Sequence, residues 1–275
     1  MARITSAQRK TQTDFLEIRS RDVRTVQGLT RGLSVLRAFQ PGDISLSNSE
    51  LALRVGLPKS TVSRLTQTLA AHGYLMYLSG VGRYMLGAGI VALCHSLLAG
   101  MPLRLAAKPE MQKLADFTRL PVSLGMRDRL DILYIETAMR RGLRAARFQL
   151  GARLPIETTS IGRAYLYALP TDERDMVIER LRQERGSDWH SVRAGIEAAF
   201  ESVTKRGFCC SYGEWRPDVF GVAAPIVGGD GPVFALNCGG APLVVSPDFL
   251  EQEVGPRLAE AANRIAKRLC SAPPT

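Results

Sequence analysis

The chain has 275 residues, with 36 Lys and Arg against 26 Asp and Glu and a formal net charge of +10. This length allows one or two domains with cores of their own. Residues 1–100 hold 12 basic and 5 acidic residues, a net +7, whereas residues 101–275 hold 24 and 21, a net +3. The basic excess favours an anionic partner for the first part. The five cysteines lack repeated spacing and therefore indicate neither a disulfide framework nor a zinc site.

Residues 1–24 are polar and basic and lack the apolar core of a signal peptide. They predict a mobile basic arm that could touch DNA, on a protein that stays cytoplasmic. After the arm, Val26, Leu29, Leu33 and Leu36 recur at helical spacing. This pattern predicts a first helix whose apolar face packs behind two later helices.

The next stretch predicts two short helices joined by a tight turn. Ser47 followed by Glu50 is a capping box, so a helix begins here, and Gly56 can adopt the left-handed conformation that ends it. Pro58 suits the first turn of a second helix that runs to about His72. A helix–turn–helix of this kind places its second helix in the major groove of DNA.

The second helix combines an apolar face with a polar face that lacks carboxylates. Val62, Leu65 and Leu69 project together and are expected in the core. Solvated helix faces usually carry Glu and Lys pairs, whereas a surface that meets phosphates requires the absence of carboxylates. Arginine can pair with guanine and glutamine with adenine. The predicted DNA contacts on this helix are Lys59, Ser60, Thr61, Ser63, Arg64 and Gln67.

Residues 74–86 predict a strand, a glycine turn and a second strand, which is the hairpin wing of a winged helix. Arg83 is the cation best placed in this hairpin to contact a DNA phosphate. Residues 25–86 are therefore predicted to form a winged helix–turn–helix DNA-binding domain.

No charged residue occurs over residues 84–103, a length of 20 residues that could span a bilayer. A membrane-anchored winged-helix regulator is therefore an alternative function. Against it, the stretch begins inside the wing and is interrupted by Gly, His, Ser and Pro. We expect instead a linker helix over residues 87–100. Because this helix is apolar all round, it should be buried by a partner, and a homodimer would bury it.

Residues 101–271 alternate predicted helices and strands, which indicates an α/β (α+β) domain with a mixed sheet. The predicted helices are 102–118, 160–169, 171–185, 192–206 and 247–269. The predicted strands are 122–127, 131–137, 144–149, 208–212, 220–227 and 232–238, with a turn at 228–231.

Thr158, Thr159 and Ser160 precede a predicted helix that begins near Ile161. The unpaired N–H groups and the positive dipole end of a helix make its start a natural site for a carboxylate. Serine and threonine are also ordinary N-cap residues. The pattern alone leaves both interpretations open.

These motifs together resemble the IclR (isocitrate lyase regulator) family of transcription factors. The resemblance covers nearly all of residues 26–270 and is strongest at residues 31–36, 51–64, 73–75, 151–155, 159–164 and 222–226. The Thr-Ser-Ile-Gly-Arg sequence at 159–163 looks most like the branch that governs protocatechuate and β-ketoadipate catabolism. The resemblance implies a GAF-like effector-binding domain, a double-stranded DNA operator, and a homodimer or a dimer of dimers.

The resemblance also implies a small carboxylate effector between this helix start and the facing strands. At the family's positions this chain has Tyr212 for a frequent aspartate, Gly221 for a cysteine, and Asn237 and Gly239 for two serines. The glycines would enlarge the pocket and Tyr212 would supply a stacking face and a hydroxyl. We therefore expect an aromatic or dicarboxylic acid larger than glyoxylate or pyruvate. The expected effector contacts are Ser160, Ile161, Tyr212, Gly221, Asn237 and Gly239.

A cysteine-dependent enzyme is a further alternative. Cys209 or Cys210 with Glu214 and His190 could supply a nucleophile, an acid and a base, and Glu214 could pair with Asp218. No local signature such as GxSxG accompanies them, and an enzyme has no use for a helix face free of carboxylates. We expect no catalysis, no cofactor and no metal, and a packing role for the two adjacent cysteines.

Overall fold

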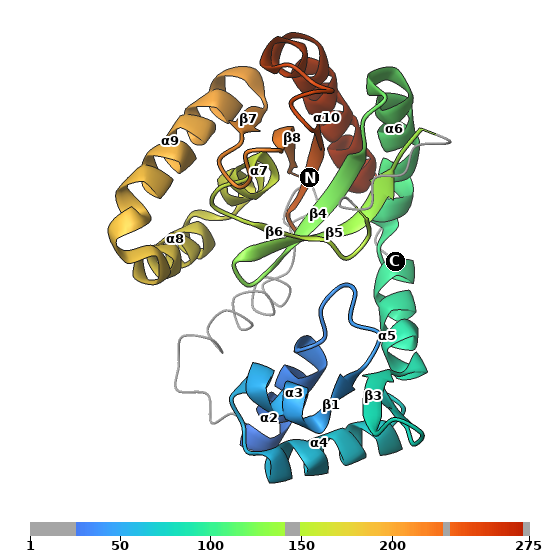
Figure 1. The fold of residues 1–275 in the computed structure, drawn as a ribbon. Helices are drawn as coiled ribbons and strands as arrows, with labels where there is room; N and C mark the ends of the chain where they lie inside the picture. The colour runs from blue at the N-terminus through green and yellow to red at the C-terminus, as the bar shows by residue number, and fades with distance from the viewer. Residues whose placement is uncertain (1–25, 141–148, 228–231, 272–275) are drawn as a thin grey trace. The chain divides into compact units, whose positions relative to one another are not determined.

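The structure is a computed structural model that describes residues 26–140, 149–227 and 232–271 of the chain. It forms two compact units, residues 1–100 and 101–275 (Figure 1). The predicted basic arm over residues 1–24 lies outside the described residues, as do the predicted turn at 228–231 and nearly all of the predicted strand at 144–149.

The first unit contains a helix–turn–helix followed by a hairpin wing, as predicted. A three-stranded antiparallel sheet has the order β1-β3-β2. The elements are α2 (Gln27–Arg37), β1 (Leu46–Ser47), α3 (Asn48–Val55), α4 (Lys59–Ala71), β2 (Leu75–Leu78), β3 (Arg83–Leu86) and α5 (Ala88–Ala99).

The predicted signals at the ends of α3 are confirmed. The Ser47 N–H donates to Glu50 Oε2 at 2.7 Å, and the Glu50 N–H donates to Ser47 Oγ at 3.3 Å, which completes the capping box. Gly56 ends the helix with a φ of +67°. Pro58 is the N-cap of α4 and so precedes the helix rather than lying within its first turn.

Helix α2 lies where it was predicted, but a different side of it is buried. Val35 is fully buried, and Gly32 lies within 3.9 Å of Leu65 on α4, measured from an added Cβ. Val26, Leu29 and Leu33 are 71%, 63% and 50% exposed. The prediction that these three pack behind the other helices is therefore wrong. Helical spacing identifies an apolar stripe but does not tell which of two stripes meets the core.

Arg83 is bound within the first unit. Its Nε donates to Ser45 Oγ at 3.0 Å, its Nη2 donates to the Ser45 carbonyl at 2.9 Å, and it forms a 2.8 Å ion pair with Glu50. This arginine therefore ties the wing strand β3 to the start of α3. The sequence prediction, which considered only a phosphate contact, did not foresee this role.

Glu50 should make the stability of the first unit depend on acid. Hydrogen bonds from Ser47, followed by the contact with Arg83, lower the pKa of Glu50 from 4.5 to about 2. Because the folded-state pKa is depressed, this stabilisation is present above about pH 4.5 and is lost as the pH falls towards 2. We expect Glu50→Gln to lower the urea midpoint more at pH 7 than at pH 2.5, by circular dichroism. An equal loss at both pH values would contradict this assignment.

The second unit is built on a six-stranded sheet with the order β6-β5-β4-β9-β8-β7. The predicted α+β class is confirmed, but every described pairing is antiparallel rather than mixed, because short connections join β4 to β5, β7 to β8 and β8 to β9. The strands are β4 (Val122–Asp128), β5 (Asp131–Ala138), β6 (Arg153–Pro155), β7 (Cys209–Tyr212), β8 (Phe220–Ile226) and β9 (Phe234–Gly240).

Helices cover both faces of this sheet (Figure 1). On one face lie α7 (Ser160–Ala168) and α9 (Trp189–Arg206), with α8 (Thr171–Arg185) beside them, and on the other lie α6 (Pro102–Thr118) and α10 (Gly255–Ser271). The core of the first face joins Tyr134, Ile161 and Ala223. The predicted helix at 247–269 is present, but residues Phe249–Val254 are π-helical before α10 begins.

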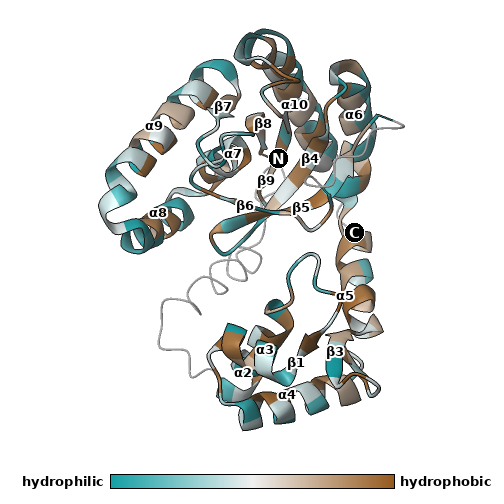
Figure 2. Ribbon diagram, viewed as in Figure 1, coloured by the Kyte–Doolittle hydropathy of each residue, from teal (hydrophilic) through white to brown (hydrophobic). Residues whose placement is uncertain are grey.

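The uncharged stretch, residues 84–103, contains the end of β3, all of α5 and the start of α6. Helix α5 has no buried residue. Within α5, Val91, Leu93 and Leu97 are 69%, 56% and 49% exposed, and Figure 2 shows the helix as predominantly hydrophobic. In the described part of the chain no single helix is long and apolar enough to cross a membrane. Within the described residues, α5 and α6 have such length and composition when taken together, but a break separates them. Helix α6 already buries Leu103 and Met111 inside the second unit.

Candidate DNA-binding helix and effector pocket

Helix α4 presents the predicted polar face to solvent. Lys59, Ser60, Arg64 and Gln67 are exposed, and Thr61 and Ser63 are half-buried. The opposite side is anchored, because Val62 and Thr66 are fully buried and Thr66 Oγ1 donates to Asn48 Oδ1 of α3 at 3.0 Å. The structure therefore brings the six predicted contacts on α4 together on one accessible surface.

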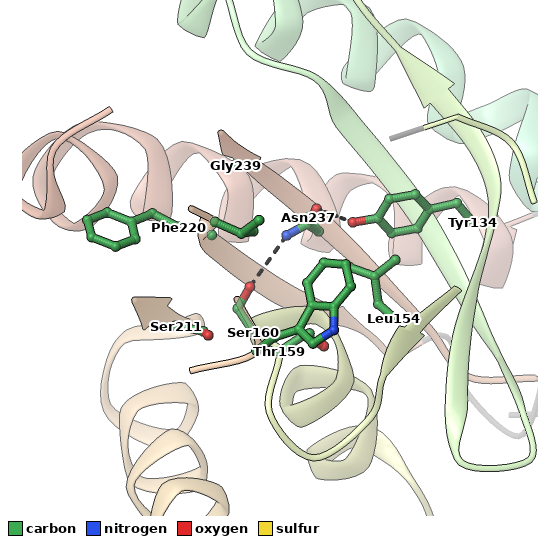
Figure 3. Close-up of a pocket in the computed structure, with 11 residues that line it drawn as sticks. Tyr134, Leu154, Thr159, Ser160, Ser211, Phe220, Asn237 and Gly239 are labelled. Carbon is green, nitrogen blue, oxygen red and sulfur yellow. Dashed lines mark hydrogen bonds between the residues drawn. The ribbon is translucent and has the colours of Figure 1, made fainter. Parts of the chain in front are cut away.

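A small pocket, partly open to solvent, lies in the second unit between the start of α7 and the sheet (Figure 3). Its walls come from β5, β6, α7, β7, β8, β9 and the loop between β7 and β8. The lining residues are Tyr134, Leu154, Thr159, Ser160, Ser211, Trp215, Val219, Phe220, Gly221, Asn237 and Gly239.

A chain of hydrogen bonds crosses this pocket (Figure 3). The Tyr134 hydroxyl donates to Asn237 Oδ1 at 2.8 Å, and Asn237 Nδ2 donates to Ser160 Oγ at 3.4 Å and to the Val222 carbonyl at 3.3 Å. Burial raises the pKa of Tyr134, so the phenol stays neutral and remains a donor. Because Ser160 Oγ is the acceptor from Asn237, its own proton is available for a ligand.

The start of α7 is fixed by its own N-cap. Thr159 Oγ1 accepts from the Gly162 N–H at 3.2 Å and donates to the Pro155 carbonyl at 2.6 Å. The first N–H groups of a helix and its positive dipole end lie at this terminus. A ligand carboxylate in the pocket would therefore meet the Ser160 hydroxyl beside a helix start.

Gly162 allows α7 to begin this close to the preceding segment. A Cβ on Gly162 would lie 2.1 Å from the carbonyl oxygen of Ile156. We therefore expect Gly162→Ala to lower the free energy of unfolding by about 1–3 kcal/mol through a backbone displacement. Gly28→Ala, where an added Cβ meets no atom within 4 Å, is the matched control and should not destabilise. Equal urea midpoints for wild type and Gly162→Ala would contradict the expected clash.

Four of the six expected effector contacts line the pocket: Ser160, Gly221, Asn237 and Gly239. Ile161 is fully buried in the core instead. Tyr212 also lies elsewhere, because its hydroxyl donates to Glu251 Oε1 at 2.8 Å, and its neighbour Ser211 lines the pocket. Neighbouring residues of a strand face opposite sides of the sheet. A shift of one residue in the comparison with the family therefore names Tyr212 where Ser211 lines the pocket.

The two glycines have different roles. A Cβ on Gly221 would lie 3.0 Å from Ser160 Oγ and 3.3 Å from Asn237 Nδ2, so this glycine does keep space open beside the polar groups. A Cβ on Gly239 would lie 2.4 Å from the Phe220 carbonyl oxygen. Gly239 therefore permits close approach of two strands, and the expectation that it enlarges the pocket is wrong.

Sequence analysis had singled out Thr159 at the helix start, but it missed the other lining residues: Tyr134, Leu154, Ser211, Trp215, Val219 and Phe220. They belong to strands and a loop that the sheet topology brings together from distant parts of the chain, and no local motif marks them. The eleven lining residues include no Lys, Arg or His.

The surroundings of Cys209 and Cys210 disfavour a thiolate. Burial raises the pKa of Cys209 to about 12 and that of Cys210 to about 11, so both thiols are protonated at neutral pH and lack the thiolate needed for attack. Glu214, the acid considered with them, forms an ion pair with Arg163. Within the described residues, no group of His, Cys, Asp and Glu is arranged to hold a metal ion.

Comparison with known proteins identifies the domains that contain α4 and the pocket. Residues 28–79 match the IclR helix-turn-helix domain, and residues 95–267 match the bacterial transcriptional regulator IclR C-terminal domain. The HTH-type transcriptional regulator TsaQ1/TsaQ2 of Comamonas testosteroni is 31% identical over 90% of each chain. The Pca regulon regulatory protein of Pseudomonas putida is 29% identical over 88% of this chain and 83% of its own.

A solved structure gives the same result. The IclR family transcriptional regulator from Brucella abortus is 40% identical, with a TM-score of 0.81, over 92% of this chain and 95% of its own. The chain therefore belongs to the IclR family of bacterial transcriptional regulators.

Proposed function

We propose that this regulator binds a small acid with one carboxylate and an aromatic body in the pocket of the second unit, and that the acid modulates operator binding by α4. The observation that carries the proposal is the distribution of polar groups in the pocket. Ser160 and Ser211 lie near the helix start on one side of Asn237, and Tyr134 and Leu154 lie on the other side (Figure 3).

This distribution favours an aromatic acid over a dicarboxylic acid. A carboxylate can be held by the helix start and the Ser160 hydroxyl. The lining residues offer no cation for a second carboxylate, and burying an unpaired charge is costly. Tyr134, Leu154 and Trp215 instead provide flat or apolar contacts. Similarity to the Pca regulon regulatory protein supports the aromatic-acid branch of the family.

A homodimer, or a dimer of dimers, completes the proposed mechanism. Two α4 helices would bind successive half-sites of a pseudo-palindromic operator. The first unit has two exposed apolar surfaces suited to self-association: the Val26, Leu29 and Leu33 stripe of α2, and α5. Thermodynamic reciprocity requires DNA to change effector affinity by the same factor as the effector changes DNA affinity.

The proposal places the protein in the cytoplasm, with the operator, and gives it no membrane anchor and no catalytic role. Support comes from the regulators to which the chain is related and from the protonated state of Cys209 and Cys210.

Fluorescence anisotropy with labelled DNA from upstream of the protein's own gene tests this function. Excess non-specific DNA is included, and protocatechuate, 4-hydroxybenzoate, succinate and adipate are titrated separately. We expect sequence-selective binding that an aromatic monocarboxylate alters and the dicarboxylates do not. A response to adipate alone would contradict the pocket argument, and indifference to every acid would refute the effector class.

A further inference from the structure

The loop between β7 and β8, residues 213–219, carries part of the pocket wall. We call these residues the pocket loop. The Gly213 N–H donates to the Val219 carbonyl at 3.0 Å, and the Val219 N–H donates to the Arg216 carbonyl at 3.0 Å. Trp215 and Val219 line the pocket. Both hydrogen bonds lie inside the pocket loop, so we expect them to open more often, and Trp215 to loosen with them, when Glu214 is released.

An ion pair joins the pocket loop to α7. Glu214 of the loop contacts Arg163, whose side chain is only 4% exposed and whose Nε donates to the Glu157 carbonyl at 2.8 Å. Helix α9 packs closely on the same guanidinium, since a Cβ on Gly195 would lie 2.4 Å from Arg163 Nη2. The arginine is therefore held within the unit.

The two partners of this ion pair differ in their access to water. The Glu214 side chain is 40% exposed, whereas that of Arg163 is buried. A partly exposed carboxylate regains much of its hydration when it leaves a pair, but a buried guanidinium does not. The pair therefore opens by movement of Glu214, and with it the pocket loop.

Arg163 and Ser160 belong to the same helix, three residues apart. Helix α7 thus provides both the polar end of the pocket and the anchor for the loop that carries Trp215. We propose that the Arg163–Glu214 ion pair is a latch that keeps the pocket loop closed and positions Trp215 against a bound ligand. This proposal rests on the proposed function, because it takes this pocket as the effector site. Arg163 and Glu214 act through Trp215 and are positioning residues.

The latch controls the rates of ligand exchange. Passage of a ligand beside Trp215 involves movement of the pocket loop, so we expect a weaker latch to speed both entry and exit and to change these rates more than the equilibrium affinity. If the ion pair served only the stability of the unit, its removal would lower Tm without selectively changing the rates of ligand entry and exit.

Hydrogen exchange of the full-length protein tests the latch without a ligand. Glu214→Gln keeps the shape of the side chain and removes its charge, and we expect exchange of the Val219 amide to rise about fivefold while exchange in α7 is unchanged. The control Glu197→Gln removes the charge from an exposed pair with Arg193 on α9 and should leave Val219 unchanged. Unchanged Val219 exchange in Glu214→Gln, or a rise spread over the whole second unit, would overturn the proposal.

Stopped-flow fluorescence then tests the latch with 4-hydroxybenzoate as the probe. The chain has two tryptophans, so Trp189→Phe leaves Trp215 as the reporter. We expect Glu214→Gln in this background to accelerate both association and dissociation severalfold. Binding at unchanged rates would overturn the latch and leave the proposed function standing. Faster Val219 exchange without binding of any acid would support the latch and refute the proposed function.

Discussion

Replacing Arg64 with Ala is expected to weaken binding to operator DNA by about 1–3 kcal/mol, the range for a side chain that reads a base. Arg64 is exposed on α4, and Val62 and Thr66 anchor the opposite side of the helix in the core. The loss should therefore come from a missing contact rather than from a damaged helix. Anisotropy titrations with operator and non-specific DNA measure it.

The comparison with Lys59→Ala separates base contacts from phosphate contacts. Lys59 lies at the first position of α4, where a cation would meet the DNA backbone, so its removal should weaken binding to all sequences alike. Arg180→Ala, in an exposed pair with Glu184 of the second unit, should change neither affinity. If Arg64→Ala weakens operator and non-specific binding equally, Arg64 contacts a phosphate and does not read a base.

Ser160→Leu is expected to abolish the effector response and leave operator binding intact. Ser160 is 2% exposed and accepts a hydrogen bond from Asn237 Nδ2. Leucine would fill the polar end of the pocket and leave the Asn237 amide without this acceptor, so the acid would lose both space and a donor. Loss of binding by at least about 100-fold should appear in calorimetric titrations with the responsive acid.

Two further variants test whether misfolding, rather than the lost contact, explains the loss of acid binding in Ser160→Leu. Ser160→Ala removes the hydroxyl without adding volume and should weaken acid binding by about tenfold, the value of one charge-assisted hydrogen bond. Ser187→Leu, at an exposed position in the second unit, should bind acid normally. A normal response from Ser160→Leu would remove Ser160 from the effector site.

The local signals of the first unit were predictable from sequence because each involves neighbouring residues. The capping box of Ser47 and Glu50 and the left-handed Gly56 depend on a few adjacent positions. The burial of Val35 instead of Leu33 was not predictable, since it depends on where α4 packs. The ties from Arg83 to Ser45 likewise join residues 38 apart.

The pocket shows the same division. Ser160, which lines the pocket, was predicted from the signature of a helix start together with the resemblance to the family, because the signature alone also fits an ordinary N-cap. Tyr134 and Leu154 were missed because they reach the pocket through the pairing of β5 with β6, which no local pattern encodes. On β7 the prediction named Tyr212, whereas its neighbour Ser211 lines the pocket. An error of one residue along a strand selects the side chain on the opposite face of the sheet.

The pocket lining contains no Lys, Arg or His. DNA binding by α4 and acid binding in the pocket should therefore depend differently on ionic strength. Contacts between cations on α4 and phosphates release counterions, so DNA affinity should fall steeply as salt is added. A carboxylate held by a helix start and hydroxyl groups inside a pocket is much less screened. In concentrated salt the regulator should therefore leave DNA while its pocket stays filled, which allows effector affinity to be measured separately from DNA binding.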